Sequence, residues 1–146
     1  MILGIDYHDT ITYHPEFFKN LIESWNDKIY ILSGTPESKR QEILTGLKKL
    51  EITGYDELLL AFEYKKENMT ADHFTKMKKY KLEKIREYNI QIYFDDNPIY
   101  VNYLRNEGIL VFQPVLSDKY IDEFSKRDKY FTCHFQRNQF KNISIE

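Results

Sequence analysis

The first ten residues constrain the fold most strongly, because they join a short apolar run to a cluster of polar side chains. Residues 2–5 read Ile-Leu-Gly-Ile, and residues 6–10 read Asp-Tyr-His-Asp-Thr. A short apolar run without alternation is typical of a strand buried on both faces of a parallel sheet. Open α/β sheets bind their ligands beyond the carboxyl ends of such strands. The polar stretch is therefore the first candidate for a functional site.

The rest of the chain alternates apolar runs with amphipathic segments. The pattern predicts helices at residues 15–26, 36–50, 73–88 and 99–106, and further strands at residues 29–32, 58–62, 90–94 and 109–112. Thr35 is the expected N-cap of the second of these helices. Strands that alternate with helices of this length are typical of right-handed βαβ units. The pattern thus predicts an α/β fold, a Rossmann-like three-layer sandwich around a mostly parallel sheet of about five strands.

The last part of the chain is predicted to complete the same domain. Ser117 is placed to cap a final helix, and residues 129–135 have the composition of an edge strand. Neither a linker nor an internal repeat divides the sequence, so we expect a single domain over residues 1–146. An exposed aromatic edge strand would favour a homodimer.

Composition narrows the function classes. The net charge is −2 and 30% of the 146 residues are charged, with both signs mixed, so no nucleic-acid or membrane surface is indicated overall. The single cysteine, Cys133, excludes an internal disulfide framework. The sequence shows neither a secretory leader nor a run of about 18 apolar residues. We therefore expect a cytoplasmic protein that does not enter membranes.

Polar groups follow three of the predicted strands. These groups are Asp6, then Ser33 and Gly34, then Asp95 and Asp96. The carboxyl ends of parallel strands lie at one edge of a sheet, so the three aspartates are predicted to meet there. They would repel one another unless a cation joined them. Carboxylate and carbonyl oxygens favour a hard ion, and Mg²⁺ is the expected metal.

The same edge offers groups that could receive an anion. Thr10, Ser33, the backbone N–H groups near Gly34 and a lysine are the candidates. A divalent cation, an anion cradle and a carboxylate that can attack together make a phosphoryl-transfer site.

The lysine has to be chosen from several that crowd residues 76–84. At 100° per residue, Lys81 falls inside an apolar sector of the helix and Lys78 falls beside it, whereas Lys76 and Lys79 lie on the far side. Lys81 is therefore the predicted site lysine and Lys78 the reserve. The alternative is that the stem of Lys81 only carries its ammonium group to the surface. The apolar sector is formed by Phe74, Met77, Ile85 and Tyr88.

Taken together, these motifs resemble those of the haloacid dehalogenase-like (HAD) phosphohydrolases. Residues 6–10 match the first motif, a strand followed by Asp-x-Asp-x-Thr, and residues 31–34 (Ile-Leu-Ser-Gly) match the second. Lys81 matches the third motif, and residues 93–98 (Tyr-Phe-Asp-Asp-Asn-Pro) match the acidic fourth. The four motifs stand in the family's order. The resemblance covers roughly residues 1–115 and implies a HAD-like fold.

The resemblance also implies a division of roles. Asp6 would be the nucleophile that forms an aspartyl-phosphate. The metal would be held by Asp6, by the backbone carbonyl of His8, and by Asp95 or Asp96. The residues that follow Lys81 are similar to the 5′-nucleotidase-like and polynucleotide 3′-phosphatase-like branches, which implies a nucleotide or a nucleic-acid end as substrate.

The remaining polar groups would bind the phosphate. The resemblance implies that Ser33 and Lys81 bind the phosphoryl oxygens, together with the backbone at Gly34. Thr10 would steady the first loop.

One departure from the family's pattern bears on turnover. His8 stands where hydrolysing members have the Asp that serves as general acid and base. An imidazole can do this work, and Asp9 could substitute if the loop were bent differently. Three alternatives stay open: a phosphatase that uses His8, a slow or specialised phosphotransferase, and a catalytically inactive phosphate- or nucleotide-binding or regulatory protein.

The spacing of the motifs leaves no room for a large cap domain. Between Thr10 and Ser33 the sequence has room for one helix and one strand. The stretch from Gly34 to Lys81 also holds a predicted helix and a predicted strand, and the residues left over are too few for a cap domain. The site should then be open, which suits a phosphorylated small molecule or a nucleic-acid end. Rings near the site could stack on a base, although simple packing is the alternative for each. These rings are Tyr7, Tyr13, His14, Tyr64 and Tyr100.

Overall fold

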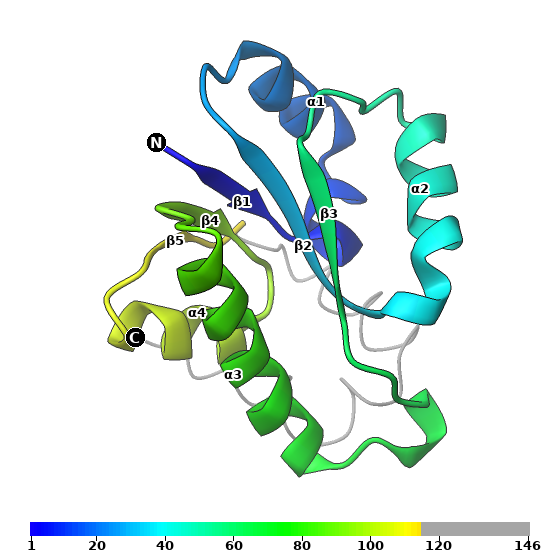
Figure 1. Cartoon of the computed structure of the whole chain (residues 1–146), viewed down its shortest axis with the longest axis vertical. Helices are drawn as coiled ribbons and strands as arrows, with labels where there is room; N and C mark the ends of the chain where they lie inside the picture. Colours follow the sequence, from blue (N-terminus) through cyan, green and yellow to red (C-terminus); the bar gives the residue numbers. More distant parts are fainter. Residues whose placement is uncertain (115–146) are drawn as a thin grey trace.

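A computed structural model describes residues 1–114 and shows a five-stranded, fully parallel sheet (Figure 1). The strand order is β3-β2-β1-β4-β5, so the first strand is central. This arrangement confirms the predicted α/β sandwich with a central parallel sheet. The strands are β1 (Leu3–Ile5), β2 (Ile29–Pro36), β3 (Glu57–Ala61), β4 (Ile92–Phe94) and β5 (Leu110–Phe112).

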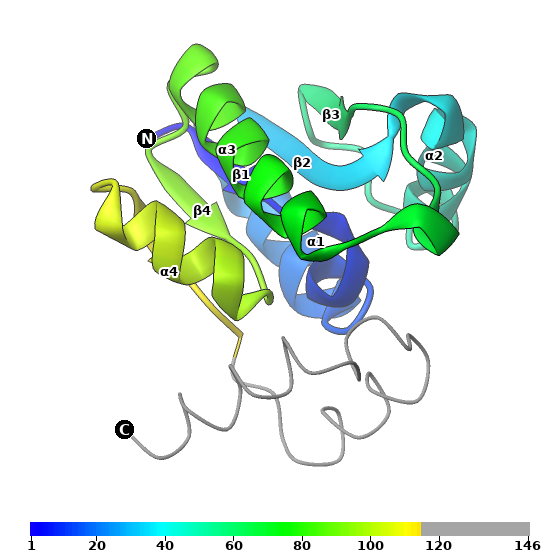
Figure 2. The same cartoon turned by 90° about the horizontal axis from the view of Figure 1, so that it is seen from below.

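Helices cover both faces of the sheet, as Figures 1 and 2 show from two directions. One core cluster joins α1 and α2 to the sheet, and a second joins α3 and α4 to the opposite face. The connections carry these helices and three short turns, so the described residues contain no large cap domain. The helices are α1 (Pro15–Ser24), α2 (Arg40–Lys49), α3 (Ala71–Glu87) and α4 (Pro98–Asn106).

The central strand β1 is buried on both faces, as its sequence predicts. Leu3 and Ile5 pack into the cluster with α1 and α2. Gly4 faces the other way, and a Cβ atom there would press on Ile90 and Tyr93. A residue without a side chain is thus needed where α3 ends and β4 begins against the sheet.

The register of the strands brings their polar ends together. Ile5 pairs with Ile31 of β2 on one side and with Phe94 of β4 on the other. Asp6 and Asp95 are each the next residue along the chain. The edge predicted from the sequence is therefore formed by neighbouring strands.

The start of the second helix differs from the prediction. Strand β2 continues to Pro36, which pairs with Ala61 after a shift of register, and a short turn, η2 (Glu37–Lys39), separates it from α2. Thr35 does not cap a helix because it lies within β2, where its Oγ1 accepts a hydrogen bond from the Ser33 hydroxyl. Continued pairing with β3 thus overrides the local helix-start signal.

The other helix and strand boundaries differ only slightly from the predicted ones. Helix α3 begins at Ala71, after a short turn, η3 (Lys66–Asn68), and β4 begins two residues later than predicted. The predicted final helix from Ser117 and the edge strand at 129–135 lie outside the described residues. Within residues 1–114, no helix combines the length and the apolar character that crossing a bilayer requires.

Candidate active site

Asp6 is held at the end of the central strand by the backbone of the neighbouring strand β4. Its N–H donates to the Phe94 carbonyl at 2.9 Å. The chain then makes a tight turn, η1 (Tyr7–Ile11), in which Asp9 adopts a left-handed conformation with φ 63°. The Asp9 N–H donates to Thr12 Oγ1 at 2.8 Å and closes this turn. The turn carries Thr10 back toward Asp6.

The loop is anchored by packing as well as by hydrogen bonds. The ring of Tyr7 is buried and its hydroxyl lies against Gly46 of α2, where a Cβ atom would overlap it. Of the alternatives for Tyr7, stacking on a base or packing in the domain, the structure shows packing.

Three carboxylates converge at the edge of the sheet. Asp6, Asp95 and Asp96 are all buried, and one oxygen from each lies within 4.8 Å of the others. The predicted juxtaposition of these aspartates is therefore observed. Their roles as metal ligands remain a prediction that the geometry permits.

Thr10 ties the first loop to the acidic pair. Its Oγ1 lies 3.3 Å from Asp6 Oδ2 and 3.2 Å from Asp96 Oδ1, and it accepts a hydrogen bond from the Asp96 N–H at 3.1 Å. These contacts suit the loop-steadying role expected of Thr10. Its contact with a substrate stays a prediction.

Lys81 is the lysine that reaches the carboxylates. Its side chain is 1% exposed, and Nζ donates to Asp6 Oδ1 at 3.1 Å and to Asp95 Oδ2 at 2.6 Å. The ring of Tyr100 lies 4.8 Å from the same nitrogen. The reserve candidate, Lys78, instead lies over the ring of Tyr103. The stem of Lys81 therefore points inward and does not carry its charge to the surface.

The buried charged groups shift one another's pKa values. Burial raises the pKa of Asp6, and the positive charge of Lys81 only partly offsets this effect. Burial and the charge of Asp6 raise the pKa of Asp95 to about 6. The same two causes raise the pKa of Asp96 well above its ordinary value. Burial lowers the pKa of Lys81, but the carboxylates of Asp6 and Asp95 outweigh it and raise this pKa well above the ordinary value.

This imbalance of charge suits a divalent cation. Three buried carboxylates face one buried ammonium group, so full ionisation leaves negative charge without a partner. Ligands on opposite sides of Mg²⁺ are about 4.2 Å apart, close to the observed spread of the three oxygens. An all-oxygen donor set favours Mg²⁺ over softer metals. The residues present therefore fit the ion that the sequence predicts.

Three of the anion-binding candidates, Ser33, Gly34 and Lys81, line a hollow of about 670 Å³ together with the carboxylates, whereas Thr10 is fully buried behind it. Ser33 Oγ is buried and is paired with Thr35, donating to its Oγ1 at 2.9 Å and accepting from its N–H at 3.1 Å. Gly34 is held by Tyr64, whose hydroxyl donates to its carbonyl at 2.7 Å. The side chain of His8 is exposed and lines this hollow together with Asp6.

Two residues of the network were not predicted from the sequence. The Tyr93 hydroxyl donates to Asp95 Oδ2 at 2.8 Å and accepts from Lys81 Nζ at 3.0 Å. The Asn97 N–H donates to Asp95 Oδ1 at 2.9 Å, while the Asn97 side chain caps α4. An Asn before Pro is a helix-start signal that could have identified Asn97. A tyrosine in a short strand gives no such signal.

Comparison with known proteins supports the fold. No protein-family profile matches the chain, and no curated protein matches it. A chain in the Pnkp1/Rnl/Hen1 RNA repair complex is 20% identical, with a TM-score of 0.59, over 80% of this chain. The present chain spans only 42% of that larger chain. At this identity the likeness concerns the fold alone.

Two further solved structures match over 86% of the chain, with lower scores. One is an uncharacterized protein from Corynebacterium glutamicum, 14% identical over 92% of its own length, with a TM-score of 0.49. The other is the core domain of a predicted phosphoglycolate phosphatase from Streptococcus pneumoniae, 13% identical over 95% of its length, with a TM-score of 0.48. The α/β fold of the present chain is the predicted Rossmann-like sandwich with a central parallel sheet.

Proposed function

We propose that this protein is a Mg²⁺-dependent phosphatase that hydrolyses a phosphate monoester. The observation that carries the proposal is the convergence of Asp6, Asp95 and Asp96 around the buried Lys81 at the carboxyl edge of the sheet. A carboxylate nucleophile, a cation site and a positively charged side chain are the parts that phosphoryl transfer requires. The likeness to a chain of an RNA repair complex is compatible with this function.

The reaction would proceed in two displacements. In the first, an Asp6 oxygen forms a bond to phosphorus, and the bond from phosphorus to the substrate oxygen breaks. The substrate oxygen takes a proton and leaves as an alcohol. In the second, a water oxygen forms a bond to phosphorus and the bond from phosphorus to the Asp6 oxygen breaks, which restores the carboxylate and releases inorganic phosphate. The proton that the water loses would pass to the group that protonated the leaving oxygen in the first displacement.

The surrounding residues would stabilise the charge that moves during these steps. Lys81 would hold the phosphoryl oxygens and Asp6 in position, since Nζ already touches the Asp6 carboxylate. Ser33 would donate to another phosphoryl oxygen by exchanging its present partner, Thr35. Bound Mg²⁺ would be held by Asp6, Asp95, Asp96 and the His8 carbonyl, and would neutralise the phosphate charge.

The direct test is phosphate release from an aryl phosphate and from a panel of nucleotide and sugar phosphates, with and without Mg²⁺, over pH 5–9. Activity that requires Mg²⁺ supports the proposal. Absence of release from every ester favours the second candidate, a phosphate- or nucleotide-binding protein without turnover. That candidate is favoured by one observation, the histidine that stands at the acid-base position.

We expect His8 to supply the proton for the leaving group. His8→Ala should then lower kcat by roughly 10²-fold for an alkyl phosphate, whose leaving oxygen needs a proton. The same variant should lower kcat much less for an aryl phosphate, whose leaving oxygen is stable without one. Comparing the two substrates in the same variant provides the control.

Equal rates of wild type and His8→Ala on both esters would show that His8 has no part in proton transfer. The variant His8→Asp separates the remaining alternatives. A large rise in kcat would show that the native histidine limits turnover and would favour the binding protein. A fall would show that the site is organised around the imidazole.

We expect Mg²⁺ to stabilise the protein more at pH 7.5 than at pH 5. In the unfolded chain aspartates titrate near pH ~4, whereas Asp95 titrates at about 6 in the folded protein. In the metal-free fold Asp95 therefore binds its proton more tightly than in the unfolded chain. The stability that this group contributes is complete below pH ~4 and is lost as the pH rises through about 6. Mg²⁺ at about 100 times its dissociation constant should restore roughly 3 kcal/mol.

Thermal unfolding with and without Mg²⁺ at the two pH values measures this difference. The exposed carboxylate of Asp72 on α3 provides a control, because Asp72→Asn should leave the Mg²⁺ effect unchanged. An equal effect of Mg²⁺ at both pH values would contradict the prediction.

A further inference from the structure

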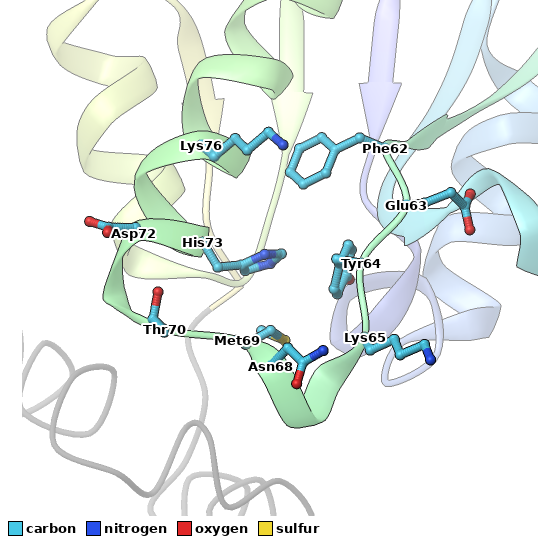
Figure 3. A pocket seen from close by; sticks show the side chains of 10 residues that line it. All are labelled: Phe62, Glu63, Tyr64, Lys65, Asn68, Met69, Thr70, Asp72, His73 and Lys76. Carbon is cyan, nitrogen blue, oxygen red and sulfur yellow. The ribbon is translucent and has the colours of Figure 1, made fainter.

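A second hollow of about 600 Å³ opens beside the candidate active site (Figure 3). It lies between the segment 62–65 that follows β3 and the first turns of α3. Tyr64, Lys65, Met69 and His73 line this hollow and the one that contains Asp6. The two hollows are therefore neighbours with a shared wall, and the mechanism above uses only one of them.

Aromatic rings form the inner wall of the second hollow. The ring centroids of Tyr64 and His73 are 4.3 Å apart, and the Phe62 ring lies 6.0 Å from His73. The three side chains are half-buried, so part of each ring faces the open space. Figure 3 shows Tyr64 and His73 extending toward each other from opposite sides of the hollow.

Most of the other lining groups are polar or charged, with the lysines Lys65 and Lys76 and the carboxylates of Glu63 and Asp72 among them. Lys76 Nζ lies 4.1 Å from the centre of the Phe62 ring, and Figure 3 shows its stem reaching across the hollow. Asn68 and Thr70 also line the hollow and offer hydrogen-bond donors and acceptors. Burial and the charge of Lys76 lower the pKa of His73, so its imidazole is neutral at neutral pH and adds no charge to the wall.

We propose that this second hollow binds a nucleobase whose nucleotide presents its phosphate to Asp6. The inference rests on the proposed phosphatase function and names its substrate class. A base is planar, stacks on aromatic rings whatever its identity, and carries polar edges that need partners. A plain sugar phosphate would leave the aromatic wall unused. Lysine and carboxylate side chains both line the wall, so the aromatic rings and the polar groups, and not a net positive charge, carry the inference.

Tyr64 connects the two hollows, so a base bound in one could position the phosphate in the other. Tyr64 contributes its ring to the second hollow, and its hydroxyl donates to the carbonyl of Gly34 at 2.7 Å. Gly34 lies next to Ser33, the expected phosphate ligand. Binding energy gained on the aromatic wall would thus help to hold the phosphate at the nucleophile.

The kinetic test compares adenosine 5′-monophosphate with ribose 5-phosphate, which lacks only the base. Wild type should show a kcat/KM at least about tenfold higher for the nucleotide, since stacking of one base is worth about that much or more. His73→Ala and Lys76→Gln should each remove most of this preference by raising KM for the nucleotide. The matched control is Lys79→Gln on the exposed side of the same helix, which should leave the preference unchanged.

A third substrate distinguishes a free mononucleotide from the end of a nucleic-acid strand. A short single-stranded oligonucleotide with a terminal phosphate should have a lower KM than the mononucleotide if the protein acts on strand ends. A higher KM would identify the mononucleotide as the substrate. Equal kcat/KM for ribose 5-phosphate and the nucleotides would overturn the base site while leaving the phosphatase function intact.

A binding measurement keeps the inference testable if no ester is hydrolysed. Adenosine has the base but no phosphate ester, so its binding does not depend on turnover. In ¹⁵N-labelled protein, adenosine should shift the backbone resonances of residues 62–76, and ribose should not. Absence of adenosine-specific shifts in these residues would overturn the base site even in an inactive protein.

Discussion

Asp6→Asn is expected to reduce Mg²⁺-dependent phosphate release by roughly 10³-fold or more, the scale seen when a nucleophile is removed. An amide oxygen is a poor nucleophile, so the first displacement fails. The amide keeps the shape of the carboxylate and removes one of three buried charges that repel one another. The metal-free variant should therefore unfold at a temperature no lower than that of the wild type.

Phosphate release and thermal unfolding of the two proteins measure this prediction. Glu83→Gln, on the exposed surface of α3 and outside both hollows, controls for a change of charge elsewhere in the protein. Activity retained in Asp6→Asn would assign the reaction to a different nucleophile. Loss of activity together with a large loss of stability would show that Asp6 holds the fold and would leave its chemical role unsupported.

Lys81→Met should have the largest combined effect on stability and rate. Removing one partner of a buried charge cluster costs roughly 3–5 kcal/mol, because the remaining carboxylates lose their counter-charge. Losing a group that stabilises the transition state should lower kcat by roughly 10²–10³-fold. Mg²⁺ should recover part of the lost stability, because it supplies positive charge to the same carboxylates.

Chemical denaturation and phosphate release, each with and without Mg²⁺, test this expectation. Lys78→Met is the matched control, since Lys78 lies on the same helix and contacts Tyr103 outside the acidic cluster. Equal stability of Lys81→Met and wild type without Mg²⁺ would contradict the charge balance described for the site.

The parts of the site that follow from strand ends could be predicted from the sequence. An aspartate that follows a buried strand marks the carboxyl end of that strand. Because β1 and β4 are parallel neighbours, these ends lie at the same edge of the sheet, and Asp6 and Asp95 meet there. Lys81 could be found because a lysine within the apolar sector of a helix has to enter the interior. Both inferences use the pattern of apolar residues within one segment, so they require no knowledge of contacts between distant parts of the chain.

The parts that depend on contacts across the fold could not be predicted. Thr35 has the composition of a helix cap, but pairing of β2 with β3 extends the strand past it. Tyr93 is a core residue by its pattern, and only the three-dimensional structure shows its hydroxyl between Lys81 and Asp95. The aromatic hollow brings together the end of β3 and the start of α3, and no local pattern joins these segments.

A crystal soaked with Mn²⁺, a stand-in for Mg²⁺ with a strong anomalous signal, tests the central claim most directly. The account predicts one anomalous peak in the described part of the chain, bonded to oxygens of Asp6 and of Asp95 or Asp96 at about 2.2 Å. Asp95→Asn should weaken or remove that peak. A cluster that binds no Mn²⁺ at millimolar concentration near neutral pH, or a peak bonded elsewhere, would contradict the account.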